Sequence, residues 1–276
     1  MSAQQLITEH IDLWTSTIKA RKTQGRGSNK KRELYGIKKL RELILELAVR
    51  GKLVPQDPID EPASVLLERI AAEKTLLIKD KKIKKQKALP DITNNEKQFE
   101  LPDGWETVRL GVLTKKLTDG SHNPPRNSGE GYPMLSGKNI NYGEIDFKNP
   151  SRYVTEKDYV QETLRTDVMP GDVLLTIVGS IGRSAVVPEE FPQFVLQRSV
   201  AVIQTLVNPK YLSLHFVSPL CLNYFDIHAK GTAQKGIYLG QLSQMPMLVP
   251  PLSEQHRIVA KVDELMALCD QLEQQT

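Results

Sequence analysis

The chain has 276 residues, and its hydrophobic fraction of 39% and charged fraction of 25% are ordinary for a globular protein with a buried core. It contains no apolar run of about eighteen residues and no signal-peptide pattern at its N-terminus, so we expect a cytoplasmic protein that does not enter a membrane. Its two cysteines, Cys221 and Cys269, are too few for a disulfide framework or a zinc site, and the net charge of +4 is unevenly spread.

Basic residues are concentrated near the N-terminus. Ten lysines and arginines and one acidic residue lie between Lys19 and Arg41, and six lysines lie between Lys79 and Lys87. Residues 101–205 instead hold eleven basic and thirteen acidic side chains. The sequence therefore predicts that the surface able to neutralise phosphates lies mainly before residue 90, with scattered basic loops elsewhere.

The first hundred residues are predicted to be helical. Apolar residues with a period of about 3.6 predict one helix from Leu6 to Ile18 and a second from Ile37 to Leu47, with Gly51 as its C-cap. A flexible basic linker, RKTQGRGSNKKR, separates the two. After the prolines of LVPQDPIDEPA, the pattern SVLLERIAAEKTLLIKD predicts a third helix.

From Leu101 the pattern changes to short β-rich runs punctuated by Gly, Pro and Asn, such as GDVLLTIVG and SVAVIQTLV. PKYLSLHFVSPLCLNYF predicts a helix interrupted near Pro219, and MPMLVPP predicts a last extended segment. We therefore predict an α+β protein with a helical region and basic linkers over residues 1–100, a mixed β-rich domain over 101–250 and a closing helix over 251–276.

The closing helix, predicted to begin at Ser253, carries a narrow apolar seam. Its members recur every three or four residues, as do the a and d positions of a coiled coil: Ile258, Val262, Leu265, Cys269 and Leu272. So short a stripe also fits an amphipathic helix lying on its own domain. Because a narrow seam suits another helix better than a broad sheet, we expect its partner to be an N-terminal helix or another chain.

No catalytic constellation is evident. HNPPR resembles the Asn-Pro-Pro-aromatic motif of adenine methyltransferases, but Arg126 replaces the aromatic residue and no glycine-rich turn for a methyl donor precedes it. GYPMLSGKN lacks P-loop spacing, GSIGR is better explained as a turn between strands, and the histidines lack metal-ligand spacing. We predict no metal site. A free-standing methyltransferase is the enzyme alternative, and it would have to bind a methyl donor.

What remains is a set of polar loops on a β-rich platform. TDGSHNPPRNSG, SGKNINYG, LQRS and KGTAQKG carry side chains that can pair with base edges and phosphates. Loops are polar in most proteins, so composition alone does not establish this use.

The order of these segments resembles one half of the DNA sequence-specificity subunit of a Type I restriction-modification enzyme. The resemblance spans nearly the whole chain and is most specific in PPLSEQHRIVAKVDEL and LRELILELAVRGKLVPQDP. It implies a non-catalytic subunit whose recognition domains read double-stranded DNA. Its helices would form an antiparallel coiled coil that binds two methyltransferase subunits, and restriction subunits would complete the nuclease. S-adenosylmethionine, ATP and magnesium would then serve the partners, with no cofactor in this chain.

The chain departs from the family pattern in length. Full-length members carry two recognition domains and two helical regions, whereas this chain has one of each, so we expect a fragment or a natural half-subunit. Our hypothesis is a homodimer whose closing helices lie antiparallel and hold the two reading domains roughly 34 Å apart, one turn of B-DNA. The alternative is a helical assembly factor or regulator without base readout.

The resemblance also places base contacts in the variable loops of the recognition domain. On that basis the predicted base contacts are Ser121, His122, Asn123, Arg126, Lys138, Asn139, Gln197 and Arg198. Gln234 and Lys235, in GTAQKG, are predicted to hold phosphates or a groove edge. Because residues 101–205 are slightly acidic, we expect the chain alone to bind DNA weakly and the methyltransferase partners to clamp the duplex.

Overall fold

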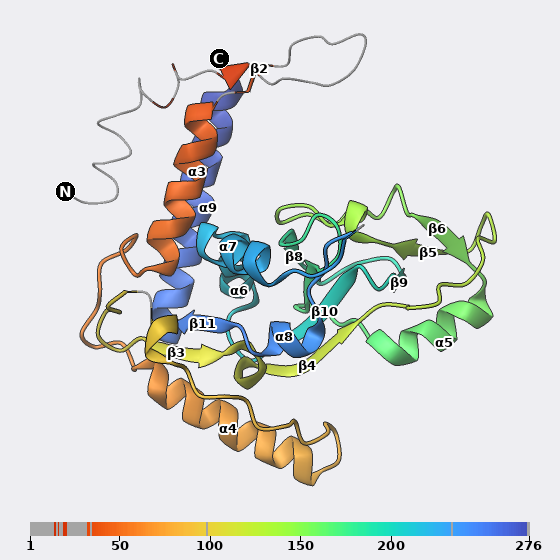
Figure 1. The fold of residues 1–276 in the computed structure, drawn as a ribbon, viewed down its shortest axis with the longest axis horizontal. Coiled ribbons are helices and arrows are strands. Elements are labelled where there is room, and N and C mark those ends of the chain that lie inside the picture. Colours follow the sequence, from red (N-terminus) through yellow and green to blue (C-terminus); the bar gives the residue numbers. More distant parts are fainter. Residues whose placement is uncertain are drawn as a thin grey trace.

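The computed structural model describes residues 35–97, 99–232 and 234–274, together with Trp14, Ser16 and the paired strands β1 (Lys19–Ala20) and β2 (Arg32–Glu33). Apart from these residues, the predicted first helix and the basic linker lie outside the described part. The mixture of helices and strands confirms the predicted α+β class (Figure 1).

Two predicted helices of the N-terminal region are confirmed as α3 (Tyr35–Val49) and α4 (Ala63–Lys79). Helix α3 ends in a Schellman motif: Gly51 has φ 66°, and the Lys52 N–H donates to the Leu47 carbonyl at 2.9 Å. The glycine C-cap was therefore predicted correctly. Helix α4 ends in the same way, but a lysine, Lys81, takes the left-handed position with φ 57°.

Three sheets make up the β-rich part. The largest has the order β4-β10-β7-β8 and is antiparallel throughout, and β11 pairs with β3. The third has the order β6-β5-β9, in which β5 and β9 are parallel. The strands are β3 (Glu106–Arg109), β4 (Thr114–Asp119), β5 (Tyr132–Leu135), β6 (Arg152–Val154), β7 (Val173–Thr176), β8 (Ser184–Val186), β9 (Val195–Leu196), β10 (Val200–Thr205) and β11 (Pro246–Val249).

The central strands are apolar on both faces because the large sheet is buried on both sides. In β7, Val173 and Leu175 face one core, whereas Leu174 faces another. Strand β10 alternates in the same way, with Ala201 and Ile203 on the first side and Val202 on the second. This two-sided burial explains the continuous apolar runs in the sequence.

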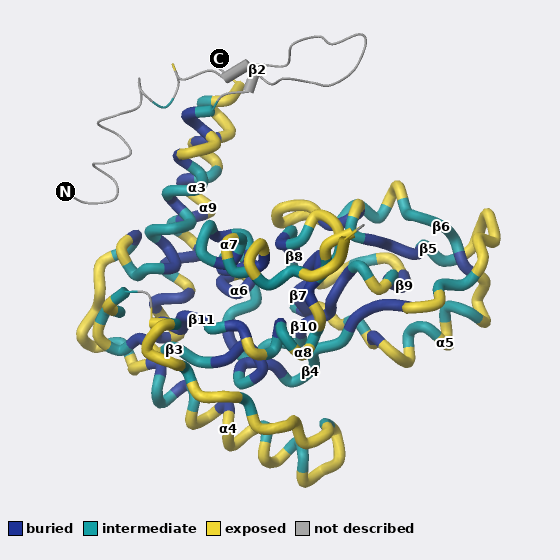
Figure 2. The backbone as a smooth tube through the Cα atoms, in the orientation of Figure 1, coloured by how far each residue is buried: buried dark blue, intermediate teal, exposed yellow. Residues whose placement is uncertain are grey.

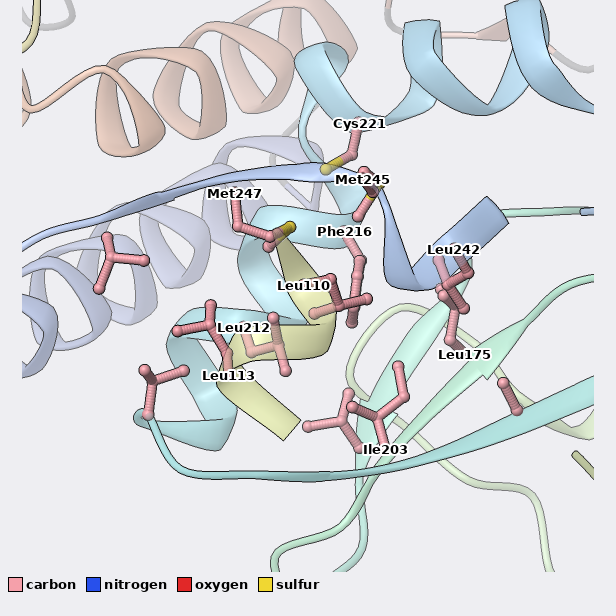
Figure 3. Packing of buried hydrophobic residues seen from close by; sticks show 14 of the residues in the cluster. Leu110, Leu113, Leu175, Ile203, Leu212, Phe216, Cys221, Leu242, Met245 and Met247 are labelled. Atoms are coloured by element: carbon pink, nitrogen blue, oxygen red, sulfur yellow. The ribbon is translucent and has the colours of Figure 1, made fainter. Parts of the chain in front are cut away.

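Helices cover the first of these cores. They are α4, α6 (Pro209–Val217), α7 (Pro219–His228) and the short α8 (Leu239–Ser243), together with the 3-10 turn η2 (Leu110–Leu113). The predicted break before Pro219 is confirmed. Phe216 and Leu110 lie at the centre of the cluster in Figure 3. Because Leu66 of α4 belongs to the same cluster, this core crosses the predicted boundary at residue 100.

Helix α9 (Leu252–Gln274) begins one residue before Ser253, and it packs against α3 of the same chain. The two helices project together from the rest of the molecule (Figure 1). Arg41 of α3 donates to Asp270 at 2.7 Å and to Glu273 at 2.9 Å, near the far end of α9. At the other end, the side chain of Gln56, which follows α3, donates to Glu254 near the start of α9 at 2.8 Å. The helices are therefore antiparallel.

The predicted seam of α9 faces α3 and the base of the pair. Its first four members are at most 3% exposed, and Leu272 is partly buried against the same cluster. In Figure 2 the α3–α9 pair carries buried residues along its length, alternating with exposed ones. The prediction of a helical partner is confirmed, and the partner is in cis. The homodimer stays a prediction, although in this chain α3 occupies the seam through which the two closing helices would pair.

A buried arginine ties the segment between α4 and β3 to the domain. Arg109, 6% exposed, donates to both carboxylate oxygens of Glu96 and to the carbonyls of Pro90, Asp91 and Gln244. Glu96 closes the 3-10 turn η1 (Asn94–Glu96). Hydrogen bonds from Arg109 are the main reason why the pKa of Glu96 falls to about 2.

Candidate nucleic-acid interface

Loops from five places in the chain meet at one edge of the sheets. Strands β4 and β7 both run antiparallel to β10, so their C-terminal ends lie at the edge where β10 begins. The 3-10 turn η3 (Gly137–Asn139) follows β5, which runs parallel to β9. These loops and residue 234 enclose an open concavity of about 680 Å³. Its polar and charged lining consists of Ser121, His122, Ser136, Lys138, Ser180, Arg183, Gln197, Arg198, Ser199 and Gln234.

Main-chain hydrogen bonds hold the loops together. The Ser121 N–H donates to the Leu196 carbonyl at 2.7 Å, and the Arg198 N–H donates back to the Ser121 carbonyl at 3.0 Å. The Gln197 N–H donates to the Leu135 carbonyl at 2.9 Å. This close approach requires Gly120, because a Cβ there would lie 2.2 Å from the Leu196 oxygen. The concavity therefore has a fixed floor.

The lining is cationic. Lys138, Arg183 and Arg198 contribute to it, and no carboxylate does. Within the described residues, the guanidinium groups of Arg183 and Arg198 form no side-chain hydrogen bond or ion pair, whereas Lys138 donates to the Pro150 carbonyl at 3.1 Å. Several other basic side chains of residues 101–205 are paired with carboxylates, namely Arg109, Lys115, Lys116 and Arg165. The net charge of residues 101–205 is slightly negative, but the lining of the concavity is positively charged.

Six of the ten predicted contact residues meet here. The concavity is lined by Ser121, His122, Lys138, Gln197, Arg198 and Gln234. Asn123 and Arg126 are exposed on the loop that follows His122, outside the lining. Whether any of these side chains contacts a base remains a prediction.

Three of the predicted contact residues interact with other groups of the protein. Asn139 is 1% exposed; its side chain accepts from the Ser136 N–H at 3.0 Å and donates to two carbonyls, so it holds η3 in shape. Ser121 is 4% exposed, and its hydroxyl donates to Glu162 at 2.9 Å. Lys235 is paired with Asp226 of α7 at 3.2 Å and is not part of the lining. The predictions for Asn139 and Ser121 are corrected because both side chains are buried and already hydrogen-bonded. The role of Lys235 stays a prediction, because its side chain is 59% exposed and its ion pair is a weak surface pair.

Sequence reasoning missed Arg183. GSIGR does form the predicted turn between β7 and β8, and the Arg183 N–H donates to the Thr176 hydroxyl at 2.9 Å. The turn presents the arginine side chain to the concavity. A basic residue in a tight turn at the end of a buried strand was the available signal.

The imidazole of His215 and the thiol of Cys221 lie in the core and are not accessible to a substrate. His215 and Cys221 are 0% and 2% exposed, and His215 Nδ1 lies 3.0 Å from Cys221 Sγ. Burial lowers the pKa of His215 to about 4 and strongly raises the pKa of the Cys221 thiol. Among the described residues, no group of three or more His, Cys, Asp or Glu could hold a metal ion, and no helix has the length and apolarity needed to span a bilayer.

Comparison with known families gives this interface its context. Residues 102–276 match the Type I restriction modification DNA specificity domain, which covers more than half of the chain. The chain belongs to this family. The matched region contains every loop that lines the concavity, as well as α9.

Relatives within this specificity-domain family are similar over the full chain. It is 42% identical over 293 residues to the Type I restriction enzyme EcoAI specificity subunit of Escherichia coli, covering 100% of this chain and 47% of that protein. For the EcoEI specificity subunit of the same species, identity is 41% over 289 residues, with the same coverage of 100% and 47%. The chain thus spans about half the length of these relatives.

Among solved structures, the HsdS subunit from Thermoanaerobacter tengcongensis is similar at 18% identity with a TM-score of 0.44. The similarity covers 95% of this chain and 62% of that one.

Proposed function

We propose that this chain is the DNA-reading part of a Type I restriction-modification specificity subunit, acting in the cytoplasm on one half of a bipartite target. The observation that carries the proposal is the concavity: loops from separate strands bring arginine, lysine, glutamine and histidine side chains together on a fixed floor, without a carboxylate. Such side chains form the hydrogen bonds by which proteins distinguish base edges and hold phosphates. Membership of a DNA specificity family supports the same use.

The proposal assigns chemistry to other polypeptides. Relatives of this chain are named as specificity subunits of restriction enzymes, so we expect methyltransferase subunits, and restriction subunits with them, to bind it. The chain itself is proposed to be non-catalytic, with S-adenosylmethionine, ATP and magnesium used by those partners. The projecting α3–α9 pair, about 34 Å long over α9, is the surface we assign to methyltransferase docking. A second copy, if present, would have to bind elsewhere than the seam of α9.

Selection from a pool of duplexes with a randomised core tests this function. The chain, alone and with its methyltransferase partner, should enrich one sequence motif. Arg198→Ala and Arg183→Ala should each weaken binding to that motif, by roughly 5- to 150-fold if the lost contact is a bidentate base contact. Lys115→Ala is the control, because this lysine of β4 is paired with Glu73 and does not line the concavity.

The result also separates the alternative functions. A helical assembly factor or regulator would enrich no motif yet still bind the methyltransferase. A free-standing methyltransferase would bind S-adenosylmethionine in equilibrium dialysis without a partner. Equal affinity of the chain for every duplex in the pool, with and without the partner, would contradict the proposed reading role.

A further inference from the structure

One histidine of the concavity is held in a fixed orientation. Nε2 of His122 lies 2.7 Å from a carboxylate oxygen of Asp119, and the His122 side chain is 53% exposed. A carboxylate accepts hydrogen bonds and cannot donate one, so Nε2 carries the proton. In the neutral ring, Nδ1 is then an acceptor. Nδ1 forms no hydrogen bond within the described residues, and the ring lines the concavity.

Asp119 is in turn fixed by helix α5 (Glu156–Thr166). The Arg165 guanidinium donates to Asp119 Oδ1 at 2.7 Å and to the Asp119 carbonyl at 2.9 Å, and Asp119 is only 7% exposed. The two carboxylate oxygens therefore have separate partners: Oδ1 belongs to Arg165 and Oδ2 to His122. Because Oδ2 accepts from Nε2–H, the neutral imidazole has a single tautomer, with its proton on Nε2.

We propose that Asp119 acts as a positioning residue that makes His122 an acceptor for the exocyclic amino group of one base, adenine or cytosine, in the major groove. This inference rests on the proposed DNA-reading function. In the major groove only adenine N6 and cytosine N4 carry hydrogen-bond donors, whereas guanine and thymine present acceptors at the corresponding edge. An acceptor at Nδ1 pairs with the first two and meets a lone pair on the others.

The environment of Asp119 allows the tautomer to be reversed. In Asp119→Asn, Arg165 still offers only donors, so the asparagine Oδ1 must face Arg165 and its Nδ2 must face His122. Nε2 of His122 would then accept, and the proton would move to Nδ1. The same ring in the same place would become a donor, suited to guanine O6 or N7 or to thymine O4.

A second carboxylate, on helix α5, provides the control. Glu162 of α5 accepts from the Ser121 hydroxyl at 2.9 Å, immediately before His122 in the chain. Glu162→Gln removes one negative charge beside the loop that carries His122 but keeps an oxygen that can accept this bond. Glu162 forms no hydrogen bond with the imidazole, so this substitution leaves the tautomer unchanged.

The test is selection of duplexes from a pool with a randomised core by the full chain with its methyltransferase partner. The wild-type protein should prefer adenine or cytosine roughly three- to tenfold at one position, as one hydrogen bond allows. Asp119→Asn should shift that position alone to guanine or thymine. His122→Ala should lose the preference there, and Glu162→Gln should keep it.

Three results would overturn the inference. One is an Asp119→Asn motif identical to that of the wild type. Another is a His122→Ala motif that keeps every preference, a result that also decides the matter if Asp119→Asn does not fold. The third is an identical change in Asp119→Asn and Glu162→Gln, which would reflect charge and not the tautomer. Failure of the wild type to enrich any motif would instead contradict the proposed function.

Discussion

Leu40→Ala should separate the outer part of the α3–α9 pair without unfolding the domain. Leu40 and Cys269 are each 1% exposed and belong to the same apolar cluster between the helices. Removing a buried leucine side chain costs about 2–5 kcal/mol because it loses burial and leaves a cavity. The salt bridges of Arg41 to Asp270 and Glu273 involve half-exposed partners, so Arg41→Gln should cost at most about 1 kcal/mol.

The two cysteines of the chain allow this to be measured by thiol labelling under native conditions. Cys269 reports opening of the helix pair, and Cys221, which is 2% exposed in the other core, reports opening of the domain. A loss of 2–5 kcal/mol from the opening free energy corresponds to roughly 30-fold or more faster labelling of Cys269. Arg41→Gln should accelerate it by about fivefold at most.

The refuting results are specific. If Leu40→Ala accelerates Cys221 and Cys269 equally, the pair does not open separately from the domain. If Cys269 of the wild type reacts as fast as an exposed thiol, α3 does not cover the seam.

Further predictions concern the parts that hold the interface in place. Arg109→Ala should lower the free energy of unfolding by about 3–5 kcal/mol in urea titrations, because three carbonyls lose their donor and Glu96 loses its cation and keeps only its hydrogen bonds from Thr93. Because the folded-state pKa of Glu96 is depressed to about 2, its stabilisation, at most about 3 kcal/mol, is complete above pH 4.5 and is lost as the pH falls through about 2. Glu96→Gln should flatten the stability profile in this window. Lys81→Gly should raise thermal stability by up to about 1 kcal/mol, because glycine takes the φ of 57° without strain; unchanged or lower stability would contradict this.

Much of the fold could be predicted from the sequence, because helix ends and strand burial depend on local sequence patterns. Gly51 ends α3 as a glycine C-cap should, and the apolar runs of β7 and β10 are those of strands buried on both faces. The helix that packs against α9 could not be predicted, because an apolar stripe on a helix can pack against a helix of the same chain or of another chain. Packing of Leu66 across the boundary at residue 100 likewise depends on tertiary structure.

The site was only partly predictable for the same reason. Asn139 was chosen for its hydrogen-bonding chemistry, although Ser136 three residues earlier gives the S-x-x-N spacing of a capping box, which the structure contains. Arg183 was not predicted to contact DNA because GSIGR was interpreted only as a turn between strands. The sequence does not show in which direction a residue of a turn points its side chain. The pairing of Lys235 with Asp226 could not be foreseen, since it joins a loop to a helix face.

The most direct test of the reading role is a structure of this chain bound to the duplex that it selects. Base edges should lie within hydrogen-bonding distance of the Arg198 guanidinium and of Nδ1 of His122, with Arg183 against a base or a phosphate. A duplex that lies along another surface and leaves the concavity empty would contradict the account.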